Sequence, residues 1–214
     1  MSDTPRSRLV VPLTVAVVGG VGFAAVALSV DGAFAVADAR AHEALFDAFG
    51  RSVELGRAVT WFGNNATLMT LVIGLAVVLA VLRQWGDVAR LVLASGGGAL
   101  VINGLKWAFG RERPLDPVIP AEGLSFPSGH ATASTIFYSV LVVLVWRWTE
   151  NRAIRWSAVV LAPVLFVGVG LSRVYLNVHF LSDVVAGWCT GAAWLGVSLA
   201  IVRAVEARSA DRAR

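Results

Sequence analysis

Six apolar stretches, each bracketed by charged residues, constrain this chain more than any other feature of its sequence. The stretches are Leu9–Val30, Thr60–Leu82, Leu91–Leu105, Ala131–Trp146, Trp156–Ser172 and Val184–Val202. A helix needs about 20 mainly apolar residues to cross a bilayer. The first, second and sixth stretches reach that length, and the other three need long side chains at their ends that extend to the interface. Because none alternates as a strand does, and lipid requires internally satisfied backbones, we predict an all-α integral membrane bundle of six transmembrane helices.

The composition supports a membrane protein with a single domain over residues 1–214. The chain is 57% hydrophobic and only 15% charged, whereas soluble domains are about 25% charged. Eight Trp and many Arg are typical of interfacial anchors. The basic residues are scattered between apolar stretches rather than gathered in one patch, so we predict no nucleic-acid partner. Cys189 is the only cysteine, which excludes an internal disulfide and a cysteine-based metal site.

The distribution of Lys and Arg predicts the orientation. With the N-terminus inside, 11 of the 18 basic residues fall in inner segments and seven in outer ones. The positive-inside rule therefore predicts cytoplasmic termini, in a bacterial inner (plasma) membrane. The first stretch could instead be a cleaved signal peptide, since Ala33-Phe34-Ala35 resembles a cleavage site. Its apolar run, however, exceeds the roughly 7–15 residues of such signals.

Between the first two spans, residues 38–57 predict an amphipathic helix. Apolar side chains recur at helical spacing on one side and charged side chains occupy the other, which is the pattern of a helix lying on a membrane surface. The two sets are Leu45, Phe46, Phe49 and Val53 against Glu43, Asp47, Arg51 and Glu54. The segment is either a connector or a guide for a lipid head group, and His42 is expected on its water-facing side.

Three outer segments carry polar residues that apolar packing does not explain: Lys106–Pro114, Pro127–His130 and Ser172–Asp183. In the six-span topology all three emerge on the same side of the membrane. Each has an ordinary structural interpretation when taken alone, as an interfacial anchor, a helix cap or a surface ion pair. Their convergence favours a functional site instead.

The chemistry of these residues suits phosphate. Lys106, the only lysine among 18 basic residues, together with Arg113 and Arg173, could surround a phosphate group. Ser128 and Gly129 precede a helix start, where free backbone N–H groups, a hydroxyl and a close backbone approach all favour anion binding. We therefore interpret these five residues as phosphate ligands.

The two histidines supply the reactive groups. His179 and Asp183 are four residues apart, so they share a face if the segment is helical. A carboxylate that holds one imidazole nitrogen leaves the other nitrogen available for attack. His130 then serves as the acid for the leaving oxygen. Phosphoryl transfer needs mainly positioning and positive charge, so we predict no metal and no cofactor.

The pattern Lys106-x6-Arg113-Pro114, Pro127-Ser128-Gly129-His130 and Ser172-Arg173-x5-His179-x3-Asp183 resembles the signature of the type 2 phosphatidic acid phosphatase superfamily, which includes vanadium haloperoxidases. The resemblance implies a metal-independent phosphatase that works through a phosphohistidine. It implies His179 as nucleophile, Asp183 as its partner and His130 as acid. The six spans resemble the membrane lipid phosphatase branch, whose substrates include phosphatidic acid, phosphatidylglycerol phosphate and undecaprenyl pyrophosphate.

Other classes of function fit the sequence less well. A non-catalytic phospholipid-binding protein or lipid carrier would not need the groups for attack and protonation. A transporter would carry charged residues near the middle of its spans, and the apolar stretches contain none. A haloperoxidase is disfavoured by the membrane setting. The expected partners are thus a lipid phosphate substrate and membrane lipid, while the oligomeric state and the particular lipid stay open.

Overall fold

The computed structural model describes residues 5–50 and 52–212, which form eight helices. They are α1 (Pro5–Ala27), α2 (Ala35–Phe49), α3 (Val53–Trp61), α4 (Asn65–Val81), α5 (Trp85–Phe109), α6 (Gly129–Trp148), α7 (Arg152–Tyr175) and α8 (Leu181–Arg212). Six helical segments are long and apolar enough to cross a membrane, with α3 and α4 together forming the second. The predicted all-α bundle of six transmembrane helices is therefore confirmed.

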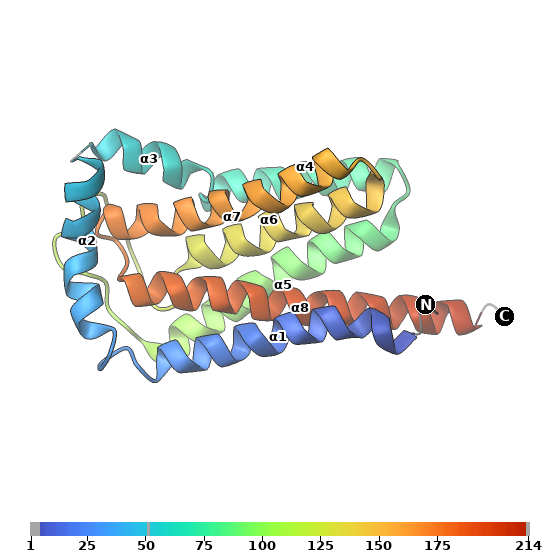
Figure 1. Cartoon of the computed structure of the whole chain (residues 1–214), viewed down its shortest axis with the longest axis horizontal. Helices are drawn as coiled ribbons and strands as arrows, with labels where there is room; N and C mark the ends of the chain where they lie inside the picture. Colours follow the sequence, from blue (N-terminus) through green and yellow to red (C-terminus); the bar gives the residue numbers. More distant parts are fainter. Residues whose placement is uncertain (1–4, 51, 213–214) are drawn as a thin grey trace.

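The spanning helices lie side by side, and α2 runs across one end of the bundle (Figure 1). The start of α1 and the end of α8 lie at the opposite end. The ends of α5 and α7 and the starts of α6 and α8 therefore meet beneath α2, because successive spans run in opposite directions. These four helix ends carry the residues that the sequence singled out.

Close helix approaches hold α8 against its neighbours. A Cβ at Gly196 would lie 2.4 Å from the carbonyl oxygen of Pro12, so α1 and α8 touch through their backbones. A Cβ at Gly187 would lie 2.8 Å from the carbonyl oxygen of Ser128. Small residues at such crossings allow helices to pack closely in lipid. The start of α8 is thereby fixed directly against the start of α6.

Residues 38–57 are divided between α2 and the start of α3 and do not form one helix, because α3 already belongs to the second spanning segment. The chain breaks at Gly50, whose φ is +76°, and α3 begins again with Ser52 as its N-cap. Buried Phe46 packs on Tyr175 with ring centroids 4.7 Å apart. His42 places Nδ1 3.2 Å from the carbonyl oxygen of Val174, so the expectation that His42 faces water is wrong. Its ring is half-buried because α2 rests on the end of α7.

Candidate active site

The loop between α5 and α6 brings the first two polar segments together. Gly110 ends α5 in the left-handed conformation, with φ +60°, which a residue without Cβ adopts at little cost. The chain then turns back over the bundle end, and the Ser125 N–H donates to the Arg111 carbonyl oxygen at 2.8 Å. The backbone N–H of Val118 donates to Leu176 at 3.0 Å, which joins this loop to the α7–α8 connection.

His179 lies in the α7–α8 connection and is only 3% exposed. Its Nδ1 lies 3.3 Å from Oδ2 of Asp183, and its Nε2 lies 3.2 Å from Nη1 of Arg113. Because a guanidinium can only donate, Nε2 is the accepting nitrogen and Nδ1 carries the proton. The expected contact with Asp183 exists, although His179 precedes α8 and the two residues do not share a helix face. The contact forms because Asp183 turns back over the helix start, where it also accepts the Phe180 N–H at 2.9 Å.

The surroundings of His179 keep its ring neutral. Burial lowers its pKa to about 4, and the positive charges of Arg113 and Lys106 act in the same direction. The hydrogen bond and charge of Asp183 oppose this lowering only in part. At neutral pH the imidazole is therefore uncharged, as a nitrogen nucleophile must be.

The three predicted phosphate-binding cations are held by neutral oxygen atoms. Arg113 donates to the carbonyl oxygens of Glu122, Gly123 and Val178 at 2.7–3.2 Å. Lys106 donates to Leu124 and Ser125, and Arg173 donates to the Thr60 hydroxyl at 2.9 Å. Within the described residues, none of the three forms an ion pair within 4.0 Å. Their orientation is fixed while their positive charge remains available to an anion.

The start of α6 supplies further donors. Ser128 is the N-cap, and its Oγ is buried with no hydrogen-bond partner in the described part of the chain. A Cβ at Gly129 would make only ordinary contacts, the nearest being 3.7 Å from Ile102. Packing therefore does not require glycine here, and the open space allows a ligand to approach the backbone. His130 follows in the first turn of the helix.

These residues line one polar pocket of about 630 Å³. Six of the eight sequence-predicted residues form its wall: Lys106, Arg113, Gly129, His130, Arg173 and His179. Ser128 and Asp183 are fully buried next to those residues. Asn65 and Asn103 complete the side of the pocket that faces the spanning helices. The structure thus brings all eight predicted residues together at one end of the bundle.

Asp38, Thr60, Arg111 and Ser125 are among the residues at the site to which the sequence analysis assigned no role. Ser125 donates its hydroxyl to Oδ2 of Asp183, and Arg111 donates to Oδ1 at 2.6 Å. Arg111 also reaches Asp38 of α2 at 3.0 Å. Arg111 lies inside the predicted segment Lys106–Pro114, and that position was the one signal available. The other three could not be found without knowing which distant segments meet.

One end of this membrane bundle thus gathers two histidines around a pocket, together with three cations that form no ion pair within the described residues. The sequence model of the PAP2 superfamily matches residues 87–206, more than half of the chain. The chain therefore belongs to the PAP2 superfamily, as its motifs predicted.

Individual proteins that are similar to this chain are also membrane lipid phosphatases. Phosphatidylglycerophosphatase B of Bacillus subtilis (strain 168) is 30% identical over 140 residues, which cover 64% of this chain and 69% of that protein. Lipid A 1-phosphatase of Rhizobium etli is 30% identical over 176 residues, 71% of each chain. The crystal structure of a transmembrane PAP2 phosphatidylglycerolphosphate phosphatase from Bacillus subtilis superposes with a TM-score of 0.74 at 25% identity, covering 87% of this chain and 93% of that one. The predicted enzyme class, a hydrolase of lipid phosphates, is the class of these relatives.

Proposed function

We propose that this protein removes the terminal phosphate from a lipid phosphate or pyrophosphate by way of a phosphohistidine. The substrate class is that of phosphatidic acid, phosphatidylglycerol phosphate and undecaprenyl pyrophosphate. One observation carries the proposal: Nδ1 of His179 is held by Asp183 while Nε2 adjoins Arg113 at the wall of a cationic pocket. This is the arrangement that a nitrogen nucleophile for phosphorus needs.

In the first step, Nε2 of His179 attacks the terminal phosphorus. The bond between phosphorus and the bridging oxygen breaks, and its electron pair leaves with that oxygen. His130 gives its proton to the departing oxygen. Lys106, Arg113 and Arg173 stabilise the charge on the three transferring oxygens, together with the Ser128 hydroxyl and the backbone at Gly129.

In the second step, water attacks the phosphorus of the phosphohistidine. His130 takes a proton from that water, and the electrons of the N–P bond return to Nε2. Inorganic phosphate leaves, and both histidines regain their starting states. The positive charge on the His179 ring during the reaction faces the carboxylate of Asp183, which orients the ring and stabilises that charge.

An apolar cavity supports a lipid as the leaving group. A space of about 510 Å³ between α4, α5 and α6 shares Asn65, Asn103, Lys106 and Gly129 with the polar pocket. Its remaining wall is made mostly of aliphatic side chains of the spanning helices. A phosphate held by the cations therefore has apolar surface directly beside it, into which a hydrocarbon chain fits.

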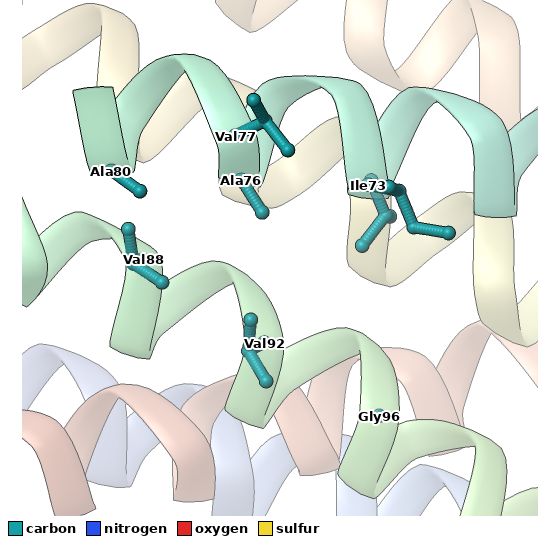
Figure 2. Close-up of a pocket in the computed structure, with 8 residues that line it drawn as sticks. Ile73, Ala76, Val77, Ala80, Val88, Val92 and Gly96 are labelled. Atoms are coloured by element: carbon teal, nitrogen blue, oxygen red, sulfur yellow. The ribbon is translucent and has the colours of Figure 1, made fainter. Parts of the chain in front are cut away.

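The apolar surface continues toward the other end of the bundle. A second space of about 470 Å³ lies between α4 and α5 and shares Gly96 with the first. Figure 2 draws this space, with Ala76 and Ala80 of α4 and Val88 and Val92 of α5 pointing toward one another. Apart from its chain neighbours and the nearby backbone of α5, no heavy atom lies within 4 Å of a Cβ built on Gly96, so the groove stays open there. This space is an open apolar groove on the side of the bundle, with Ile73 and Val92 exposed in its wall, and a hydrocarbon chain can pack along it.

Trapping the intermediate tests the mechanism. Enzyme mixed with radiolabelled lipid phosphate and quenched should carry label that is lost in acid and kept in alkali, as expected of a phosphoramidate. His179→Ala should carry none. His42→Gln, which removes the histidine outside the pocket, should label as the parent does. Label that survives acid, or labelling of His179→Ala, would contradict the proposal.

We further propose that hydrolysis needs no divalent metal. Within residues 5–50 and 52–212, no group of three or more His, Cys, Asp and Glu side chains is placed to hold a metal ion. Activity should persist in a chelator and be blocked by vanadate, which resembles five-coordinate phosphorus. Loss of activity in a chelator with recovery in magnesium would refute this.

The pocket should open on the outer face of the membrane, with both termini in the cytoplasm. This orientation rests on the excess of Arg in the segments at the end of the bundle where α1 begins and α8 ends, which we call the terminal end. Glu122 is exposed at the pocket end, and Glu150 is 91% exposed at the other end. An impermeant thiol reagent applied to intact cells should label Glu122→Cys and spare Glu150→Cys. The reverse pattern would invert the orientation.

A further inference from the structure

We propose that Asp38 of α2, acting through Arg111, is a positioning residue that holds the Asp183 carboxylate in its reactive orientation. The inference rests on the proposed function, because Asp183 matters only if His179 is the nucleophile. According to this proposal, α2 does more than connect the first two spans, because it also helps to orient a catalytic carboxylate.

Arg111 joins two carboxylates from distant helices. Its Nη1 donates to Oδ1 of Asp183 at 2.6 Å, and its Nη2 donates to Oδ2 of Asp38 at 3.0 Å. The guanidinium lies over the ring of Phe180, 4.2 Å from the centroid. A planar fork with five donors can bridge two acceptors in this way, whereas a lysine ammonium lacks that fixed geometry.

Ser182 closes the network. Its backbone N–H donates to Oδ1 of Asp38 at 2.8 Å, and its hydroxyl donates to Oδ2 of Asp38 at 2.6 Å. The same hydroxyl accepts from Nη1 of Arg111 at 2.7 Å. Asp38 therefore satisfies a free N–H in the first turn of α8, as a carboxylate at a helix N-terminus favourably does. The residue next to Asp183 in the chain is thus fixed to α2.

The two oxygens of Asp183 have separate tasks. Oδ2 contacts Nδ1 of His179 and the Ser125 hydroxyl, and Oδ1 contacts Arg111. The side chain is fully buried, so no water competes for either oxygen. The contacts that hold Arg111 in place therefore also fix the rotation of the Asp183 carboxylate. That rotation sets the direction from which Oδ2 contacts the imidazole of His179.

Charge gives Asp38 a second effect on the same group. Arg111 alone would pair with Asp183 and draw its negative charge away from His179. With Asp38 on the other side, one guanidinium is shared between two carboxylates. Asp183 keeps more of its negative charge for the imidazole, which becomes positive when it accepts a phosphoryl group. Simple attachment of α2 to the bundle would produce no such effect on the reaction.

The first test replaces Asp38 with Asn in the full chain, purified in detergent. We expect kcat to fall roughly 10- to 100-fold, which is the usual loss when a residue that orients a catalytic group through a hydrogen bond is removed. KM should stay within about twofold of the parent value. Asp47→Asn is the matched control, because Asp47 is an exposed carboxylate on the same helix. An unchanged kcat, or a raised KM with unchanged kcat, would overturn the inference.

A double-mutant cycle separates positioning from attachment. In an Asp183→Asn background, Asp38→Asn should lower turnover by less than about twofold, because its route to His179 is already broken. A full multiplicative loss in that background would show that Asp38 acts elsewhere, and would refute the inference. If Asp38→Asn does not fold, Arg111→Lys is taken through the same cycle, with the same expected and contradicting results.

Trapping distinguishes this inference from the proposed function on which it rests. If the parent enzyme forms no phosphohistidine at His179, the proposed function fails. If the parent forms it and Asp38→Asn forms it at the same rate in a single turnover, only the role of Asp38 fails. A slower rate of formation in Asp38→Asn supports both.

Discussion

Two buried clusters of charge lie at opposite ends of the bundle, and they treat their cations differently. At the terminal end, Asp87 is 2% exposed and Arg90 is 4% exposed. Asp87 accepts from Arg90 at 3.0 Å, Arg147 at 2.8 Å and the Trp148 indole at 2.9 Å. Arg90 also donates to both oxygens of Glu206, at 2.7 and 2.6 Å. Two cations therefore meet two carboxylates.

At the pocket end, Lys106, Arg113 and Arg173 meet carbonyl and hydroxyl oxygens instead. The two nearby carboxylates are already paired, Asp183 with Arg111 and His179 and Asp38 with Arg111. Positive charge at the pocket is thus left in excess, which is unfavourable until an anion arrives. We therefore propose that the paired cluster contributes to stability and that the cations at the pocket bind an anionic ligand.

The largest effect should come from His179→Ala. Removing a nucleophile that acts together with its partner typically lowers turnover by about 10⁴- to 10⁶-fold. The change should leave folding intact, and its thermal unfolding in detergent should match that of the parent. Asp183→Asn should retain measurable turnover, since the carboxylate orients rather than reacts. Full activity in His179→Ala would break the comparison, because the pocket cluster would then not be catalytic.

Arg113→Gln should follow in size. Loss of one cation that stabilises transition-state charge costs about 10²- to 10³-fold in kcat/KM. Thermal stability should hold or rise, because the variant removes one of three neighbouring positive charges. Steady-state kinetics and a melting curve on the same preparation check both parts. A large loss of stability would mean that Arg113 is structural, like the cations at the other end.

The ionisation of His179 sharpens the comparison further. Its pKa is lowered to about 4 by burial and then by Arg113 and Lys106, against Asp183, so the ring should stay neutral as pH falls from 8 to 5. Only three histidines are present, so ¹⁵N-histidine NMR can follow each one, with His42→Gln and His130→Gln for assignment. Arg113→Gln should move the pKa upward. Titration of His179 near the usual 6.5 would contradict this account.

Asp87→Asn should give the opposite pattern to Arg113→Gln. The variant keeps the shape of the side chain but leaves Arg147 and the Trp148 indole without a charged acceptor. We expect a loss of about 2–3 kcal/mol in unfolding free energy and an unchanged kcat. Asp211→Asn, an exposed carboxylate at the same end of the bundle, is the control. A loss of turnover at full stability would show that the two ends are coupled.

This comparison also explains what the sequence could predict. The proximity of the eight candidate site residues was predictable because their chemistry is rare in apolar surroundings and their spacing matches helix ends. The stretch Leu91–Leu105 looked too short for a span, whereas α5 runs from Trp85 to Phe109. The helix extends because Asp87 and Arg90 neutralise each other inside the bundle. A charge pattern read along the chain cannot reveal such pairing.

The sequence analysis did not identify Asp38 and Ser182, because their contacts join segments that are far apart in the chain. Asp38 and Ser182 are 144 positions apart, and Arg111 and Asp38 are 73 apart. Asp38 and Asp47 are both carboxylates of α2, yet one lies in the network around Asp183 and the other is exposed. Only the docking of α2 across the bundle end distinguishes them, and that docking depends on tertiary contacts such as Phe46 on Tyr175.

The smallest effect should come from Lys106→Arg, which keeps the charge and changes only its shape. The Lys106 ammonium donates to the carbonyl oxygens of Leu124 and Ser125 and lines the pocket beside Gly129. A guanidinium is wider and planar, so it cannot occupy the same point against a phosphate oxygen. We expect kcat/KM to fall about tenfold, equal to roughly 1.4 kcal/mol of transition-state stabilisation, with unchanged thermal stability. Arg90→Lys is the converse change in the paired cluster, where it should lower stability and spare turnover because a fork between two carboxylates is lost. Parental kinetics in Lys106→Arg would make this lysine an interface anchor, and the charge available at the pocket would then come from Arg113 and Arg173 alone.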